Sequence, residues 1–196
     1  MRSELGLDVG AFLALSVGRL APEKGLAYGI QALPAVLQAR PDFHWAVLGD
    51  GADRAELEEL CRDLGVGAHV HFVGFVGDPL PWYAAADLYL RTNVLEGDNL
   101  SSFQAMAAGL PVVGFDTASE TDLVPVARHG ILAENRNPAA LADAVRGLLA
   151  APDREDLGRR GATFAAANLA TERVVRSCES LYRELAGPGA RRPRQD

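Results

Sequence analysis

Short apolar runs alternate along this chain with longer stretches in which apolar residues recur every three or four positions. The runs lie at residues 12–17, 45–48, 70–73, 87–90, 112–115 and, more weakly, 131–133. Continuous apolar runs of this length are typical of strands buried on both faces, as in parallel sheets covered by helices. The pattern predicts an α/β fold with a doubly wound parallel sheet of about six strands and helices on both faces.

The stretches between the runs predict helices with recognisable ends. Four Leu and Ile residues between positions 26 and 37 share one helical face, and Pro41 ends that helix. Further helices are expected at residues 55–64, 102–108 and 138–149. Asn137 is placed to cap the last of these, with Pro138 at its first position.

The last third of the chain, residues 153–185, has a helical pattern and no strand candidate. Its final helix carries one apolar face, formed by Val174, Val175, Cys178, Leu181, Tyr182 and Leu185. Such a face is expected to pack against another surface. Residues 188–196, rich in Pro, Gly and Arg, are expected to be a disordered, solvated tail, so that residues 1–187 form one domain.

Composition narrows the class of protein. The chain has 196 residues, 48% of them apolar and 23% charged, which suits a single globular domain. Its formal net charge of −7 disfavours a nucleic-acid partner, which would need clustered Lys and Arg. No apolar run reaches the roughly 18 residues of a transmembrane segment, and no secretory signal is recognised. Cys61 and Cys178 form no cluster, so a reducing, cytoplasmic setting is expected.

The first candidate for chemistry is the segment 18–25, between the first predicted strand and the first predicted helix. Ligands of open parallel sheets bind at the carboxyl ends of the strands, where helix N-termini attract anions. Arg19 and Lys24 flank that position, and Lys24 is the one lysine beside eighteen arginines. They are suited to a phosphate, although they could equally be ordinary loop charges paired with Glu23.

The segment after the second predicted strand, Gly49-Asp50-Gly51, matches only part of a dinucleotide-binding fingerprint. The third glycine is missing, and His71 stands where an acidic residue is required about twenty positions later. We interpret Gly49 and Gly51 as a tight turn beside the same cleft. A nicotinamide cofactor, and with it an NAD-type dehydrogenase, is not expected.

The segment after the fourth predicted strand combines a carboxylate with the start of a helix. Glu96 is placed to accept hydrogen bonds from sugar hydroxyls, and the N–H groups around Leu100 and Ser101 are placed to face a phosphate. Gln104 follows one turn later on the helix. The hydroxyls of Ser101 and Ser102 are as consistent with N-capping as with ligand contact.

Other chemistries have weaker signals. His69 and His71 alternate along a predicted strand and share a face, but no third ligand accompanies them, so no metal is expected. No serine stands in a GxSxG motif, and no Cys and His pattern indicates a nucleophile.

Six motifs stand in order along the chain. They are Val17-Gly18-Arg19-Leu20 with Glu23-Lys24-Gly25, Leu48-Gly49-Asp50-Gly51 with Arg54 and Leu57-Glu58, Val70-His71-Phe72-Val73-Gly74, Tyr83-Ala84-Ala85-Ala86-Asp87, Glu96-Gly97, and Gln104-Ala105-Met106-Ala107-Ala108-Gly109-Leu110-Pro111-Val112-Val113. Together they resemble the C-terminal, nucleotide-sugar-binding domain of retaining glycosyltransferases of the GT-B fold, family 4 (glycosyl transferases group 1). The resemblance extends from about Phe12 to Leu185 and implies a Rossmann-like domain.

The resemblance implies roles for individual residues. Arg19 and Lys24 would hold the donor diphosphate and stabilise the charge on the leaving nucleotide without a metal or other cofactor. Glu96 would contact the transferred sugar and completes the implied catalytic set. The implied substrate-binding residues are Gly18, Gly49, Gly51, Arg54, Phe75, Val76, Asn99, Leu100, Ser101 and Gln104, with Phe75 and Val76 framing the base.

Two departures from the family pattern concern the ribose and sugar sites. Gln104 stands where the family has the second glutamate of its E-x7-E motif, which holds the ribose hydroxyls. A neutral amide is the weaker acceptor, by about a factor of two in bond strength. Ala118 and Ser119 replace the family's Gly-Gly, with Asp122 at the acidic position after it, and are expected to narrow the sugar site.

A larger departure is that this chain offers only the donor half of such an enzyme. The N-terminal acceptor-binding domain would precede Met1, and the final helix resembles the one that crosses back to pack on it. We expect an excised domain of a hexosyltransferase-type enzyme, inactive alone, that moves a sugar from a nucleoside-diphosphate sugar to an acceptor with retention. The missing half could also contact a membrane surface. The alternative is a non-catalytic nucleotide-sugar-binding or regulatory module, which Gln104 allows.

Overall fold

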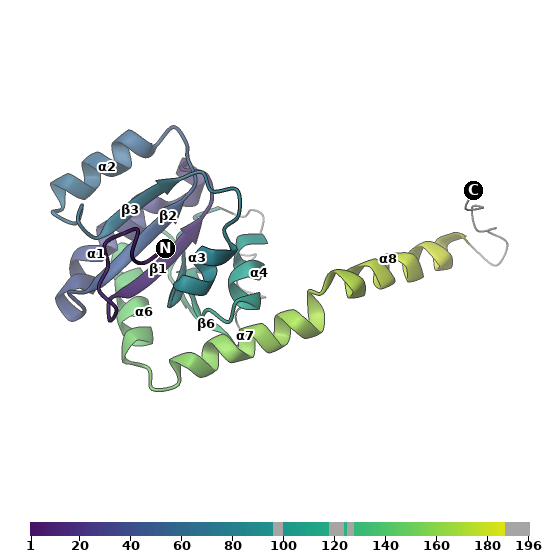
Figure 1. The fold of residues 1–196 in the computed structure, drawn as a ribbon. Coiled ribbons are helices and arrows are strands. Elements are labelled where there is room, and N and C mark those ends of the chain that lie inside the picture. Colours follow the sequence, from purple (N-terminus) through teal and green to yellow (C-terminus); the bar gives the residue numbers. More distant parts are fainter. Residues whose placement is uncertain (96–99, 118–123, 125–127, 187–196) are drawn as a thin grey trace.

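The computed structural model describes residues 1–95, 100–117, 124 and 128–186 (Figure 1). Its centre is a six-stranded sheet in which every pairing is parallel, in the order β3-β2-β1-β4-β5-β6. The strands are β1 (Phe12–Val17), β2 (Phe43–Leu48), β3 (Val70–Gly74), β4 (Leu88–Arg91), β5 (Val112–Phe115) and β6 (Gly130–Ala133). The strand order reverses between β1 and β4, which confirms the predicted Rossmann-like, doubly wound fold.

All six predicted strands are present, and two of them differ informatively at their ends. β2 begins at Phe43, ahead of the apolar run, because Phe43 is fully buried and stacks on Phe12 with ring centroids 5.5 Å apart. β4 begins after Asp87, whose carboxylate accepts a hydrogen bond from the Leu13 N–H at 2.8 Å. β4 then continues one residue beyond the prediction, to the buried Arg91.

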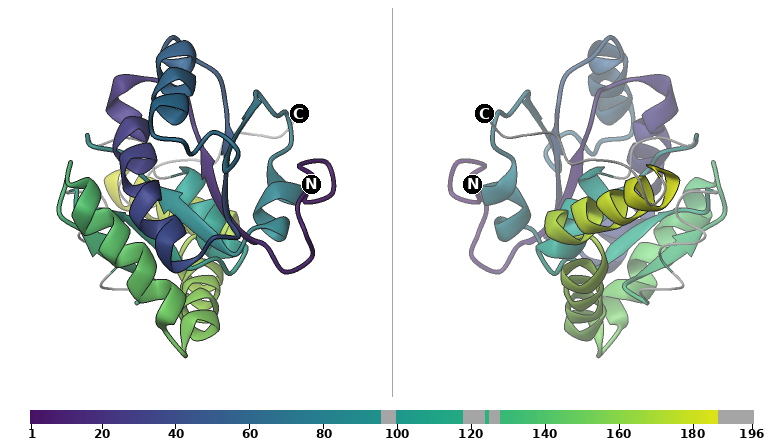
Figure 2. Two further views of the ribbon diagram at one scale, coloured as in Figure 1. Left: turned by 90° about the vertical axis from the view of Figure 1, so that its left-hand side faces the viewer. Right: turned by 90° about the vertical axis from the view of Figure 1, so that its right-hand side faces the viewer.

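Helices pack on both faces of the sheet, and Figure 2 gives two side views of this arrangement. One face is covered by α1 (Leu26–Ala39), α2 (Arg54–Asp63) and α6 (Pro138–Ala150). The other face is covered by α3 (Leu80–Ala85) and α4 (Leu100–Ala107), and α7 (Arg154–Asn168) packs on α4. Asn137 caps α6 as predicted, because its side chain accepts a hydrogen bond from the Ala140 N–H at 3.1 Å.

Two features of the helical layer differ from the sequence prediction. α3 was not predicted, since its six residues are too few to show a helical period and two of the residues around its start, Pro79 and Pro81, are prolines. The helical last third consists of two helices, α7 and α8 (Thr171–Ala186), separated at residues 169–170. The tail predicted at residues 188–196 lies outside the described residues.

The helix α8 extends away from the body of the protein (Figure 1). Four of its large apolar side chains are 48% to 76% exposed, namely Val175, Leu181, Tyr182 and Leu185. The predicted apolar face is therefore present, and in the described part of the chain it is open to solvent. Among these residues no helix is both long and apolar enough to cross a bilayer.

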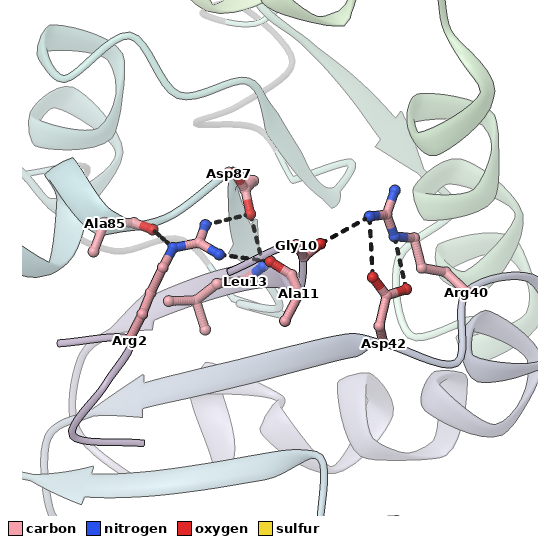
Figure 3. A network of polar contacts seen from close by, with 8 residues as sticks. All are labelled: Arg2, Gly10, Ala11, Leu13, Arg40, Asp42, Ala85 and Asp87. Carbon is pink, nitrogen blue, oxygen red and sulfur yellow. Dashed lines mark hydrogen bonds and ion pairs between the residues drawn. The ribbon is translucent and has the colours of Figure 1, made fainter. Parts of the chain in front are cut away.

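The N-terminal segment is tied to the amino end of the sheet through Arg2 (Figure 3). The Arg2 guanidinium donates to the Ala85 carbonyl at 2.8 Å, to the Ala11 carbonyl at 2.5 Å and to Asp87 Oδ2 at 2.6 Å. Because Asp87 also accepts from Leu13, one carboxylate joins this segment to both β1 and β4. The network lies at the opposite end of the strands from their carboxyl termini.

We expect Asp87→Ala to lower the free energy of unfolding by about 1–2 kcal/mol, because it leaves the Leu13 N–H without its acceptor and removes the charged one of the three acceptors of the Arg2 guanidinium. The neighbouring Arg40–Asp42 pair in Figure 3 offers a matched control. The Asp42 side chain is 50% exposed, so Asp42→Ala is expected to cost less than about 0.5 kcal/mol. Urea denaturation measures both, and equal losses would contradict the special role of Asp87.

Candidate functional site

A cleft opens at the carboxyl ends of β1 and β4, where the strand order reverses. Its cavity of about 490 Å³ is lined by the loop after β1, the loop after β4 and the first turn of α4. The lining residues are Val17, Gly18, Arg19, Glu23, Lys24, Asn93, Leu95, Leu100, Ser101 and Gln104. Six of the predicted site residues therefore converge on one cavity: Gly18, Arg19, Lys24, Leu100, Ser101 and Gln104.

A second, mainly apolar cavity of about 330 Å³ adjoins the first. The two share the wall formed by Val17, Gly18 and Arg19. Phe75 and Val76 line the second cavity together with Gly49, and Phe75 is 85% exposed at its edge. The structure thus brings Phe75 and Val76 together at one pocket, and small-molecule sites are lined predominantly by apolar and aromatic side chains.

Of the predicted site residues that the structure describes, Arg54 and Gly51 do not line these cavities. Glu96 and Asn99 lie outside the described residues, as do Ala118, Ser119 and Asp122. Arg54 is engaged elsewhere: its Nε donates to Glu58 at 2.9 Å and its Nη2 to the Phe72 carbonyl at 3.1 Å, which ties α2 to β3. Gly51 lies against Leu20 in the loop after β1.

The two glycine-containing loops pack backbone against backbone. A Cβ on Gly49, which has φ of +130°, would lie 1.9 Å from the Gly18 carbonyl oxygen, and one on Gly51 would lie 2.1 Å from that of Leu20. The Gly18 N–H donates to the Leu48 carbonyl at 2.9 Å, and the Leu20 N–H to the Asp50 carbonyl at 3.0 Å. These contacts require glycine at both positions and fix the shared wall of the cavities.

Lys24 ends a short 3-10 turn, η1 (Pro22–Lys24), that follows β1. A Cβ on Gly18 would lie 3.5 Å from Lys24 Cε, so the lysine stem lies over Gly18 at the strand end. Arg19 pairs with Glu23 at 3.0 Å, and its side chain is 78% exposed. An exposed pair is worth at most about 1 kcal/mol, so an anion in the cavity can compete for Arg19.

Gln104 is oriented by a tyrosine from another helix. The hydroxyl of Tyr83 on α3 donates toward Gln104 Oε1 at 3.2 Å and toward the Ser101 carbonyl at 3.1 Å. Tyr83 is 1% exposed, and burial raises its pKa, so it remains a neutral donor. The Gln104 oxygen keeps a second lone pair and its amide keeps two N–H groups, so the side chain can still accept and donate hydrogen bonds at the cavity. Ser102 is fully buried, which leaves Ser101 as the serine that borders the cavity.

Arg91 is a residue of the site region that the sequence analysis missed. It is 3% exposed at the end of β4, and its Nη1 donates to Thr117 Oγ1 at 3.1 Å, linking the ends of β4 and β5. Arg91 and Lys24 line the same small space, which shares Gly18, Arg19 and Asn93 with the cleft. The available signal was an arginine directly continuing a buried apolar strand, where a charge needs a specific reason.

A histidine cluster lies at the other end of β2 and β3. His44 Nδ1 is 3.1 Å from His71 Nε2, and the His44 and His69 rings are 5.1 Å apart, so the structure supplies a third imidazole beside the predicted pair. Burial lowers the pKa of His44 and of His71, which suits a hydrogen bond between neutral rings. Within the described ranges, no group of three or more His, Cys, Asp or Glu residues is arranged to hold a metal.

The sequence of this chain is similar to those of known glycosyltransferases. The family model for glycosyl transferases group 1 matches residues 11–151. An uncharacterised glycosyltransferase of Methanocaldococcus jannaschii is 36% identical over 143 residues, covering 72% of this chain and 36% of that protein. D-inositol 3-phosphate glycosyltransferase of Corynebacterium urealyticum is 30% identical over 210 residues, covering 98% of this chain and 49% of that protein. This chain thus spans about half, or less, of the length of these relatives.

Solved structures agree in fold. Sucrose-phosphate synthase of Thermosynechococcus elongatus has a TM-score of 0.83 at 28% identity, over 94% of this chain and 48% of that one. The lipopolysaccharide glycosyltransferase WaaG has a TM-score of 0.76 at 27% identity, over 84% and 45%. Anabaena HepE, solved in complex with UDP, has a TM-score of 0.80 at 24% identity over 91% and 51%, a likeness of fold.

Proposed function

Because this chain belongs to the glycosyl transferases group 1 family, we propose that its cleft binds the nucleoside diphosphate of a sugar donor. We propose further that the complete enzyme transfers the sugar from this donor to an acceptor with retention of configuration. In this proposal the diphosphate occupies the larger cavity and the base occupies the apolar cavity beside Phe75 and Val76.

The observation that carries the proposal is the convergence of positive charge on the cleft. Arg19 and Lys24 line the larger cavity together with the first turn of α4, and the buried Arg91 lines a small adjoining space together with Arg19 and Lys24. The chain as a whole carries a net charge of −7, so this cluster is a local exception. Fixed cations and helix N-termini are the groups that bind phosphates and stabilise negative charge on a departing one.

Each group has a defined task in the transfer. Arg19 and Lys24 would neutralise the charge that grows on the leaving nucleoside diphosphate as its bond to the sugar breaks. The backbone N–H groups of Leu100 and Ser101, with Asn99, would bind the phosphate oxygens. Gln104 would hydrogen-bond the ribose hydroxyls, and Glu96 would orient the sugar; Glu96 and Asn99 lie outside the described residues.

Transfer also needs a surface that binds the acceptor, which we assign to a second domain. The relatives named above are about twice the length of this chain or longer. The exposed apolar side chains of α8 are suited to packing against such a domain. On this proposal the present chain binds donor, and transfer is measured after the acceptor half of a relative is added.

The test is calorimetric titration of this chain with UDP, GDP, ADP, TDP and NAD. One nucleoside diphosphate is expected to bind and NAD is not. Binding of NAD alone would favour a dehydrogenase domain, and binding of nothing would contradict the proposal for this chain. A module that binds donor but supports no transfer with the acceptor half would match the second candidate, a regulatory role, which the amide at Gln104 favours.

We expect Gln104→Glu to strengthen binding of the preferred ribonucleotide by about two- to tenfold, because a carboxylate is a stronger acceptor for ribose hydroxyls than an amide. The Tyr83 hydroxyl can donate to the new carboxylate as it does to the amide oxygen. The matched comparison uses the 2′-deoxy form of the same diphosphate, for which the gain should shrink. An equal change for both ligands, or weaker binding of the ribonucleotide, would contradict the ribose role.

A further inference from the structure

Two hydrogen bonds join the loop after β4 to η1, the turn that carries Lys24. Thr92, the first residue beyond β4, donates from Oγ1 to the Lys24 carbonyl at 2.7 Å. Two residues later, the Val94 N–H donates to the Glu23 carbonyl at 3.0 Å. Thr92 is 2% exposed, so the first bond is shielded from water. The turn that carries Lys24 and the loop after β4, 68 positions apart in sequence, are thereby held side by side.

The turn and the loop are also in direct van der Waals contact. Gly25 follows the turn with φ of +58°, and a Cβ there would lie 2.3 Å from the Thr92 carbonyl oxygen and 2.7 Å from Val94 Cγ1. On the far side, Asn135 Nδ2 donates to the Val94 carbonyl at 3.1 Å, so the loop after β6 supports the loop after β4. The turn that carries Lys24 therefore packs against the loop after β4, which is itself held in place by Asn135.

Within this contact the two ends of the Thr92 side chain do different things. The hydroxyl holds the main chain of Lys24. The methyl group packs on α1, since a Cβ on Gly29 would lie 2.9 Å from Thr92 Cγ2. A Thr to Val change replaces the hydroxyl with a methyl group of similar size, and a Thr to Ser change removes only the methyl group. The side chain can thus be dissected without changing its overall size greatly.

We propose that Thr92 is a positioning residue for the donor site: its hydroxyl fixes the turn that carries Lys24, so that the ammonium group stays over Gly18 and ready for the diphosphate. This inference rests on the proposed function. Preorganised charge is effective because the group does not have to be ordered when the ligand arrives. Without the hydrogen bond from Thr92, the turn would adopt several conformations. Ligand binding would then have to order the turn, which costs affinity.

The test compares Thr92→Val with Thr92→Ser. We expect Thr92→Val to weaken binding of the preferred nucleoside diphosphate about three- to tenfold, the range for losing one buried hydrogen bond, and Thr92→Ser to bind within about twofold of the parent protein. In thermal unfolding, Thr92→Ser should lower the melting temperature at least as much as Thr92→Val, because serine lacks the methyl group that packs on α1. Thr163→Val is the control, since Thr163 Oγ1 makes the same type of bond, to the Arg159 carbonyl at 2.9 Å, outside the cleft.

A second readout does not depend on any nucleotide. Lys24 is the one lysine of the chain, so labelling with ¹⁵N-lysine gives a single backbone amide signal in a correlation spectrum. Thr92→Val should shift this signal and speed its hydrogen exchange, whereas Thr92→Ser and Thr163→Val should leave it in place.

The possible results separate the two proposals. If no nucleotide binds the parent protein, the proposed function fails, and the lysine amide still decides whether Thr92 fixes the turn. If the parent binds a nucleoside diphosphate but Thr92→Val binds it equally well with an unmoved amide signal, the positioning role is overturned. A Thr92→Ser variant that loses as much affinity as Thr92→Val would also overturn it, because packing and not the hydroxyl would then be responsible.

Discussion

Lys24→Ala is expected to weaken binding of the preferred nucleoside diphosphate about 10- to 100-fold, since a charge-assisted contact to a phosphate is worth about 1.5–3 kcal/mol. The lysine lies over Gly18 at the end of β1, in the cavity where Arg19 and the first turn of α4 also meet. Because Lys24 lies outside the buried core, its truncation should leave the protein folded. Calorimetric titration measures the loss, and urea denaturation checks the fold.

The control for this variant is Arg146→Ala on α6. Arg146 is an exposed cation that pairs with Asp143 at 3.2 Å and lines neither cavity. Its removal changes the net charge by the same amount, so any effect of overall charge on an anionic ligand appears in both variants. Equal losses would show that Lys24 acts through net charge alone, and an unchanged affinity of Lys24→Ala would overturn its role at the diphosphate. The Lys24 effect should also decrease as salt increases.

His129→Leu is expected to flatten the dependence of stability on pH. His129 is 0% exposed next to β6, and neither of its ring nitrogens has a hydrogen-bond partner in the described part of the protein. Burial lowers its pKa to about 4, from an ordinary value of 6.5. Between pH 6.5 and about 4, His129 is protonated in the unfolded chain and neutral in the folded protein. The free energy of unfolding is therefore highest above pH 6.5 and declines as the pH falls toward 4.

The expected size of this effect follows from the pKa difference. Each unit is worth about 1.4 kcal/mol, so His129 should account for about 3 kcal/mol of lost stability between pH 6.5 and 4. Leucine has similar bulk and no unsatisfied nitrogen, so His129→Leu should be at least as stable as the parent at pH 7. Urea denaturation from pH 4 to 7.5 tests this. His44 and His71 remain in both proteins, so the difference between the two curves isolates His129, and parallel curves would contradict the prediction.

Much of the fold was predictable because its strands are buried on both faces. Such strands leave continuous apolar runs, and all six runs proved to be strands of one parallel sheet. The sequence pattern failed where a polar residue sits in buried structure for a tertiary reason. His44 interrupts the run of β2 but bonds to His71 on β3, and Arg91 extends β4 because Thr117 accepts its hydrogen bond.

The candidate site divides in a similar way. Gly18, Lys24 and Ser101 were predictable because the carboxyl ends of parallel strands meet at one edge, so residues just after each strand converge. The supporting groups were not predictable, since each acts on a partner distant in sequence. Tyr83 orients Gln104 from a helix too short to show a period, and Thr92 holds Lys24 from 68 positions away.

The wall shared by the two cavities, residues 17–19, has a consequence for how such proteins diversify. On the proposed function, the base is selected on one side of this wall, by Phe75, Val76 and Pro79, and the leaving group is stabilised on the other, by Lys24. Substitutions at residues 75–79 can therefore change which nucleotide base is bound, while the residues that stabilise the leaving group stay the same. Donor preference and transfer chemistry become separately evolvable traits, open to independent selection or engineering.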